Sequence, residues 1–137
     1  MLSTSSIHAI RATIVLADLP EGSYAGTAKL GERIGAPPNY LGKLLQQLAR
    51  NGLLRSQKGL GGGFCLGKAA DSITLLDVVE PLEHIKRWEL CILGRTECSD
   101  AHPCSLHDRW NETRTMYLNL LGTTTIASLV VNGGAGL

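Results

Sequence analysis

Apolar residues recur at helical spacing at the start of the chain. Ile7, Ile10, Ile14 and Ala17 repeat at intervals of three and four, which predicts a helix over residues 6–18. Ser5 or Ser6 can cap this helix, and the break at residues 19–22 ends it. A shorter helix is predicted over residues 27–35. Its last residue is a glycine, which commonly ends a helix.

A second amphipathic helix is predicted from the Pro37-Pro38 turn to about Arg50, with Asn51-Gly52 as its stop. Two short helices joined by a tight turn suggest a helix-turn-helix. One face of the second helix is apolar, with Leu41, Leu44, Leu45 and Leu48 at i, i+3, i+4 and i+7. The opposite face carries amides and cations, which suit base edges and phosphates but also occur on any solvated helix face: Asn39, Lys43, Gln46, Gln47 and Arg50, with Tyr40 near the start.

Two short strands, 53–57 and 64–66, flank the glycine-rich segment Lys58 to Gly63. A helix-turn-helix followed by a hairpin predicts a winged helix, whose wing would contact phosphates through Arg55, Ser56 and Lys58. A nucleotide-binding loop is disfavoured, because the segment has no Gly-Lys-Ser/Thr and leads into a strand. Cys65 is expected to be a small core residue.

A long helix is predicted from Ser105 to Gly122. It carries one apolar stripe, which needs either a second subunit or the chain's own core to cover it: Leu106, Trp110, Thr113, Tyr117 and Leu120 or Leu121. The tail is expected to fray beyond Val131.

The 137 residues, 44% of them hydrophobic, suffice for one compact core with an appendage. We therefore expect a mainly α fold with a small β-hairpin wing, divided into a winged helix-turn-helix domain over residues 1–82 and a second part over residues 83–137. Residues 1–70 contain eight Lys or Arg and three Asp or Glu, whereas residues 71–137 contain five and nine. The basic half is the one that holds the predicted DNA-binding helix.

No apolar run is long enough to cross a membrane and no export signal is visible, so we expect a cytoplasmic protein. No catalytic nucleophile, paired carboxylates or nucleotide motif is evident, so an enzyme is not expected.

The segment 91–107 holds three of the four cysteines. Cys91, Cys98, Cys104 and His107 are separated by six, five and two residues. Thiolates and an imidazole in a loop with Gly, Ser, Asp and Pro are typical of zinc or iron-sulfur sites, although free thiols or a disulfide are also possible. The reducing environment expected for this chain favours metal or redox chemistry over a structural disulfide.

Together, the residues from Asn39 to Phe64 and the helical segment 73–80 resemble the Rrf2 family of bacterial transcription regulators. The cysteine loop resembles that of the cluster-binding members of the family, which include iron-sulfur biogenesis and nitric-oxide regulators. The resemblance implies that residues 83–137 form a cluster-binding loop and a long dimerisation helix. It also implies a homodimer that binds a pseudo-palindromic, double-stranded DNA operator, with an affinity that depends on an iron-sulfur cluster. Such a protein would be a repressor or dual regulator that senses redox state, nitric oxide or cluster supply.

The first gap between cysteines has six residues here, where the relatives have five, so two ligand sets stay open. Three cysteines and His107 would match a [2Fe-2S] cluster, which we favour. A [4Fe-4S] cluster would instead take a ligand from the first helix of the partner subunit, where His8 is the candidate; His102 also lies in the loop. Alternatives are a structural Cys3His zinc site, a direct thiol redox switch, or a small iron-sulfur electron carrier.

Overall fold

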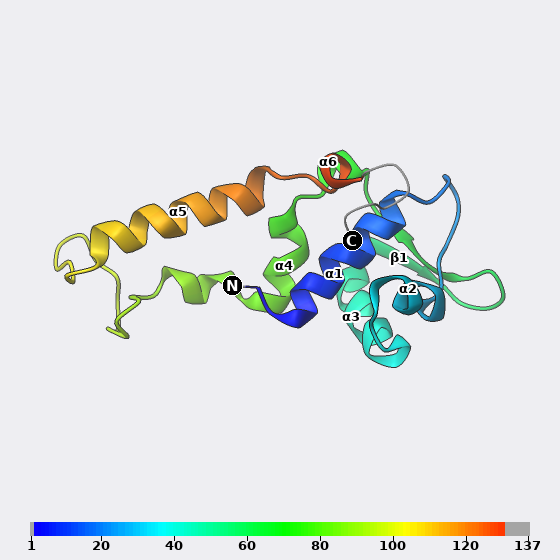
Figure 1. Cartoon of the computed structure of the whole chain (residues 1–137), viewed down its shortest axis with the longest axis horizontal. Coiled ribbons are helices and arrows are strands. Elements are labelled where there is room, and N and C mark those ends of the chain that lie inside the picture. Colours follow the sequence, from blue (N-terminus) through cyan, green and yellow to red (C-terminus); the bar gives the residue numbers. More distant parts are fainter. Residues whose placement is uncertain (1, 131–137) are drawn as a thin grey trace.

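The computed structural model describes residues 2–130, apart from the side chain of Lys86. Figure 1 shows two parts, a body built around α1 and an arm that ends in a loop far from the body. The body holds α1 (Thr4–Ala17), α2 (Thr27–Ile34), α3 (Pro38–Arg50), β1 (Leu54–Gln57), β2 (Gly63–Leu66), a 3-10 turn (Ala70–Ser72), α4 (Leu75–Glu83) and α6 (Ile126–Leu129). The arm holds a 3-10 helix (Ile85–Glu89), the cysteine loop and α5 (His107–Thr123). The predicted mainly α winged-helix fold is confirmed.

The central helix is α1, which packs against α2, α3, α4, β2 and α6. It begins two residues earlier than predicted, because the side chain of Ser3, and not that of Ser5 or Ser6, accepts the capping hydrogen bond from the Ser6 N–H. Its burial is also broader than the predicted stripe. Ala9, Ala12 and Leu16 are buried, whereas Ile7 is 44% exposed. A helix packed on several sides has no single apolar stripe.

The helix-turn-helix follows the sequence closely. Gly35 is left-handed at φ +73° and ends α2, and the leucine face of α3 is buried as predicted. Gly31 lies where the turn brings the Ala36 carbonyl against α2, and a Cβ at this position would clash with that oxygen. The turn is therefore tight enough to require glycine on the inner side of α2.

The wing is a two-stranded antiparallel hairpin in which Leu54 lies opposite Leu66 and Ser56 opposite Phe64. Phe64 also exchanges backbone hydrogen bonds of 2.9 Å with Ala25, which ties the hairpin to the segment before α2. Gly63 allows this close approach, because a Cβ there would overlap the Ala25 backbone. Leu54 and Phe64 belong to the core, so the base of the wing is held rigidly on the body.

The arm leaves the body at His84 and returns at Thr124. His84 ends α4 in the left-handed conformation, with φ +50°. After α5, the Leu75 N–H donates to the Thr124 carbonyl and the Ile126 N–H donates to the Ile73 carbonyl, and Ile126 is fully buried in the body core. The predicted division between residues 82 and 83 thus falls near the start of the arm, whereas residues 124–129 rejoin the body. The predicted fraying beyond Val131 lies outside the described residues.

A buried carboxylate joins α1 to the root of the arm. Glu83 Oε1 accepts hydrogen bonds of 2.7 Å from the Ser3 N–H and the Ser6 hydroxyl, and Arg87 Nη2 lies 2.6 Å from Oε2. Burial alone raises the pKa of Glu83, but the hydrogen bonds from Ser3 and Ser6 and the Arg87 charge outweigh burial and lower the pKa to about 2. The arm is thereby anchored to the N-terminus of α1.

Candidate functional site

The outer face of α3 forms the floor of a shallow surface hollow. Asn39, Lys43, Gln46 and Arg50 line it together with Thr27, and all four α3 side chains are exposed. Their spacing places donors for base edges and phosphates along one side of the helix, with the leucine face buried beneath. The helical periodicity of α3 therefore brings these four predicted DNA-contact residues together on one surface.

The wing extends this surface. Gln46 also lines a second hollow, together with Ser56, Lys58 and Thr27, so α3 and the Ser56 side of the hairpin are continuous. Sequence reasoning missed Thr27. Thr27 is the first residue of α2, the helix that crosses the DNA backbone in this type of motif. Its position at the start of that helix could have suggested Thr27 from the sequence.

Three of the predicted DNA-contact residues are placed differently. Tyr40 donates a 2.8 Å hydrogen bond to Ser5 Oγ, and Gln47 Nε2 donates one of 2.9 Å to the Pro81 carbonyl. The Tyr40 hydroxyl and Gln47 Nε2 thus donate within the chain, because both residues lie on the flank of α3 that faces α1 and α4. Arg55 lies on the other side of the hairpin from Ser56, since successive residues of a strand point to opposite faces.

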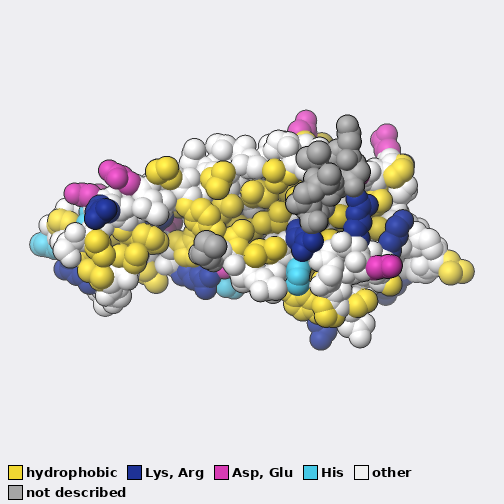
Figure 2. Space-filling view, viewed as in Figure 1, with side chains coloured by type: hydrophobic (Ala, Val, Ile, Leu, Met, Phe, Trp, Pro, Cys, Tyr) yellow, Lys and Arg dark blue, Asp and Glu magenta, His cyan; other side chains and the backbone are white. Residues whose placement is uncertain are grey.

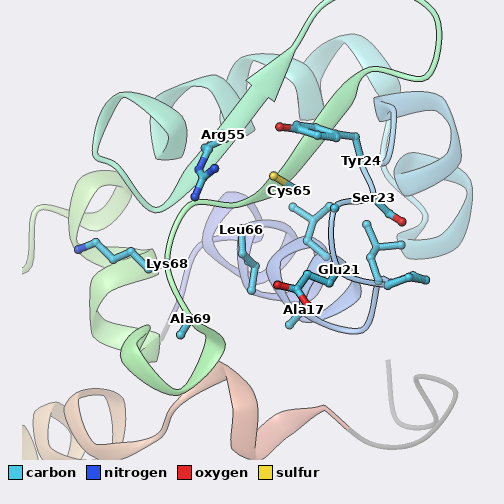
Figure 3. Close-up of a pocket in the computed structure, with 13 residues that line it drawn as sticks. Ala17, Glu21, Ser23, Tyr24, Arg55, Cys65, Leu66, Lys68 and Ala69 are labelled. Carbon is cyan, nitrogen blue, oxygen red and sulfur yellow. The ribbon is translucent and has the colours of Figure 1, made fainter.

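Figure 3 shows the hollow in which Arg55 lies. The hollow measures about 460 Å³ and is lined by Leu16, Tyr24, Arg55, Leu66 and Lys68, among others. Cys65 lies in it half-buried, which corrects the prediction of a core residue: it pairs with Arg55 across the strands and so shares the outward face. A hydrogen bond with the Cys65 thiol raises the pKa of Tyr24.

The cysteine loop brings its four candidate ligands into two pairs. The sulfurs of Cys91 and Cys104 are 3.7 Å apart, and Cys98 Sγ lies 3.5 Å from Nδ1 of His107. Cys91 is 7% exposed and His107 6%, so one member of each pair is buried. Backbone hydrogen bonds from Leu93 and Arg95 lower the pKa of Cys91, which favours the thiolate that binds metals.

The donor distances can be compared with those around a metal. Two thiolates bound about 2.3 Å from a tetrahedral metal lie about 3.8 Å apart, and a thiolate and an imidazole lie about 3.5 Å apart. Each pair therefore has the spacing of two ligands on one metal. In the described part of the chain, however, no three His, Cys, Asp or Glu side chains form a single metal-binding group. The four candidate ligands thus lie as two separate pairs and not as one group around a single ion.

The other histidines of the prediction lie apart from these pairs. His8 is on α1, with its ring edge-on to Tyr40 at a centroid separation of 5.7 Å, and Figure 1 shows α1 in the body, away from the loop. His102 is exposed, and its carbonyl accepts a 2.8 Å hydrogen bond from Arg95 Nη1. Arg95 thus joins two parts of the loop. The sequence analysis missed Arg95, although a cation between two clustered cysteines could have pointed to it.

The arm exposes large apolar side chains. Met116 is 73% exposed and Leu120 55%, and Trp88, Trp110 and Tyr117 line an apolar hollow of about 290 Å³. Figure 2 shows hydrophobic side chains gathered along the arm and its junction with the body. Within the predicted stripe, Leu121 is buried and Leu120 points outward. Further exposed apolar residues of the arm are Leu90, Ile92, Leu93 and Leu106.

A helix-turn-helix followed by a glycine-rich wing, with a continuous polar surface over both, defines a winged-helix DNA-binding protein. The chain belongs to the Rrf2 family: the family profile, described as an iron-dependent transcriptional regulator, matches residues 2–132. This is a family of transcription regulators and not of enzymes. No helix in the described residues is long and apolar enough to cross a membrane.

Individual relatives agree with this assignment. The chain is 34% identical to the HTH-type transcriptional regulator IscR of Erwinia tasmaniensis over 77% of this chain and 63% of that one. It is 30% identical to IscR of Escherichia coli O1:K1 over 96% of this chain and 80% of that one. Its fold matches the structure of CymR, the global cysteine regulator of B. subtilis, with a TM-score of 0.78 and 23% identity over 95% of each chain.

Proposed function

We propose that this chain is a cytoplasmic, homodimeric transcription regulator whose affinity for its operator depends on a [2Fe-2S] cluster held by Cys91, Cys98, Cys104 and His107. The observation that carries the proposal is the pairing of these four donors at metal-ligand spacing, at the end of an arm that grows from a winged-helix body. The similarity to IscR over most of the chain supports it.

The two pairs favour [2Fe-2S] over [4Fe-4S]. In a [2Fe-2S] cluster each iron takes two protein ligands, so the ligands come in close pairs, whereas each iron of a [4Fe-4S] cluster takes one. When bound, the cluster would supply a redox-active group that is sensitive to oxidants. A loop rich in turns, with φ +77° at Gly94, can close around such a group.

In the proposed complex, α3 enters the major groove and offers Asn39, Lys43, Gln46 and Arg50 to base edges and phosphates. Ser56 and Lys58 of the wing contact the adjacent backbone. Arg55 is on the opposite side of the hairpin and is not part of this interface. A repressor results if the operator overlaps a promoter.

The exposed apolar side chains of the arm would be covered by a second copy, because such residues need a partner to leave water. A two-fold dimer presents two α3 helices to the halves of a pseudo-palindrome. His107 is both a candidate ligand and the first residue of α5. Ligation there would set the start of the dimer helix and hence the spacing of the two α3 helices, which links cluster state to DNA affinity.

The test begins with protein purified without oxygen. We expect visible charge-transfer absorption, equimolar iron and sulfide, and tight binding to an operator selected from random DNA. Cys98→Ser should abolish the colour and change operator affinity, whereas Cys65→Ser, at the cysteine outside the loop, should change neither. Colourless wild-type protein after attempted reconstitution, or DNA binding that ignores the cluster, would reject the proposal.

Two further results would identify other centres. Stoichiometric zinc without sulfide would assign a structural zinc site. Cluster binding that survives His107→Ala and is lost with His8→Ala would assign the fourth ligand to α1 of the partner subunit.

The pair Cys91 and Cys104 also supports a second candidate, a direct thiol switch. Their sulfurs are close, and the pKa of Cys91 is lowered. Oxidation by a peroxide would join the two sulfurs, with loss of two protons and two electrons from the thiols to the peroxide. Mass spectrometry of metal-free protein after peroxide treatment tests this, with Cys104→Ser as the variant that cannot form the bond.

A further inference from the structure

His107 is held on both sides of its ring. Its Nε2 lies 2.7 Å from Asp100 Oδ1 and its Nδ1 lies 3.5 Å from Cys98 Sγ, while the residue is only 6% exposed. Asp100 and Cys98 are two residues apart in the loop, so the same short segment contacts both nitrogens. This fixes the plane of the ring as well as its position.

The neighbours decide which nitrogen carries the proton. A carboxylate can only accept, so Asp100 requires the proton on Nε2. Asn111 Nδ2 lies 3.2 Å from the same nitrogen and, because its Oδ1 accepts a 2.6 Å hydrogen bond from Arg114 Nη2, Asn111 presents an N–H donor there, which by itself would favour an unprotonated Nε2. The carboxylate contact is the shorter at 2.7 Å, and two acceptors cannot approach so closely without a proton between them. Asp100 is therefore the acceptor for Nε2–H, and the lone pair of Nδ1 is left facing Cys98.

We propose that Asp100 is a positioning residue that holds His107 in the Nε2-protonated tautomer and directs Nδ1 to the cluster site, where His107 and Cys98 act as one pair of ligands. This rests on the proposed function. Histidines that bind metals commonly donate their second N–H to a carboxylate, which sets tautomer and ring orientation, and loss of such a partner typically lowers metal affinity about 10–100-fold. Asp100 is 94% exposed, so we expect the lower end of that range.

The geometric part is tested without any metal. Protein labelled with ¹⁵N-histidine gives the protonation state of each ring nitrogen by long-range ¹H–¹⁵N correlation, with His107→Ala for assignment. We expect Nε2–H in the wild type. Asp100→Ala should shift the tautomer ratio about tenfold, whereas Asp100→Asn, which keeps an acceptor oxygen, should retain most of the Nε2–H form. Glu97→Ala removes an exposed carboxylate of the same loop and should leave the wild-type pattern.

The second measurement uses protein reconstituted anaerobically with iron and sulfide. Pulsed EPR of the reduced protein should detect one histidine nitrogen, and a chelator should remove the cluster about tenfold faster from Asp100→Ala than from the wild type or Glu97→Ala. Equal rates, or a wild-type His107 protonated on Nδ1, would overturn the role of Asp100. A wild type that takes up no cluster would instead reject the proposed function, and the tautomer measurement still decides the role of Asp100 in the loop.

Discussion

The body and the arm satisfy their apolar side chains in different ways. In the body, residues such as Leu30, Leu41, Leu45 and Leu48 are fully buried within one core. The arm has a small buried apolar cluster at its root, where Ile85 and Leu121 pack with Val79 of α4. Six of the eight exposed large hydrophobic residues in the described part of the chain lie farther out on the arm. The body thus completes its core within one chain, whereas the arm leaves apolar side chains exposed that a second copy would cover in the proposed dimer.

The largest expected effect is on the body. Leu45→Ala removes a fully buried side chain from α3 and should lower the free energy of unfolding by about 2–5 kcal/mol, measured by urea denaturation. Gln46→Ala, on the exposed face of the same helix, is the control and should change it by about 0.5 kcal/mol or less. A loss below about 1 kcal/mol for Leu45→Ala would mean that the body core is not what holds the fold together.

The joint between the two regions should show the next largest effect. Glu83→Gln should cost about 1–3 kcal/mol at pH 7, because it weakens the charge-assisted hydrogen bonds from Ser3, Ser6 and Arg87. The pKa of Glu83 is lower in the folded protein than in the unfolded chain. Its contribution is therefore present above the unfolded pKa of about 4.5 and is lost as the pH falls towards 2.

Urea denaturation between pH 7 and pH 3 measures this dependence. The wild type should lose stability more steeply below pH 5 than Glu83→Gln does. Glu80→Gln, an exposed carboxylate one turn earlier on α4, should behave like the wild type. Parallel pH profiles for the wild type and Glu83→Gln would show that the arm is not anchored through this carboxylate.

The sequence predicted segments with local signals better than it predicted contacts between distant segments. The helix-turn-helix and wing were foreseen because their signals are local: the leucine spacing of α3, the glycine at the end of α2 and the glycine-rich hairpin each determine their own segment. The burial of α1 was underestimated, because its contacts come from five elements distant in the chain. The return of Ile126 to the core had no local pattern that could reveal it.

The candidate site shows the same limit. Residue types and spacing suggested the three cysteines and His107 as candidate ligands, which stays a prediction, but could not suggest their pairing, which depends on how the loop folds. Asp100 and Arg95 act through contacts across the loop and look like ordinary surface charges in the sequence. Tyr40 and Gln47 were assigned to the DNA face because helical periodicity places them near its edge, and only the packing of α1 and α4 turns them inward.

The proposed DNA-binding surface belongs to the body and not to the arm, so substitutions there test the body separately. Lys43→Ala should weaken operator binding by about 1 kcal/mol and lower the salt-dependence slope by about 1, if Lys43 contacts a phosphate. Arg55→Ala, on the opposite side of the wing, is the charge-matched control and should leave both unchanged. Fluorescence anisotropy over a range of salt concentrations provides both quantities, and equal losses for the two variants would mean that binding depends on overall charge and not on this face.

The smallest effect on folding is expected on the arm. Met116 is 73% exposed, so Met116→Ser should change the unfolding free energy of the single chain by less than about 0.5 kcal/mol. In the proposed dimer the same side chain is covered, so the substitution should weaken dimerisation about tenfold in sedimentation equilibrium, while Thr115→Ala, its polar neighbour, should not. A monomer destabilised by more than about 1 kcal/mol would show that α5 is supported by its own chain. A dimer of unchanged affinity would place the interface elsewhere, and the arm would then need another occupant for its apolar face.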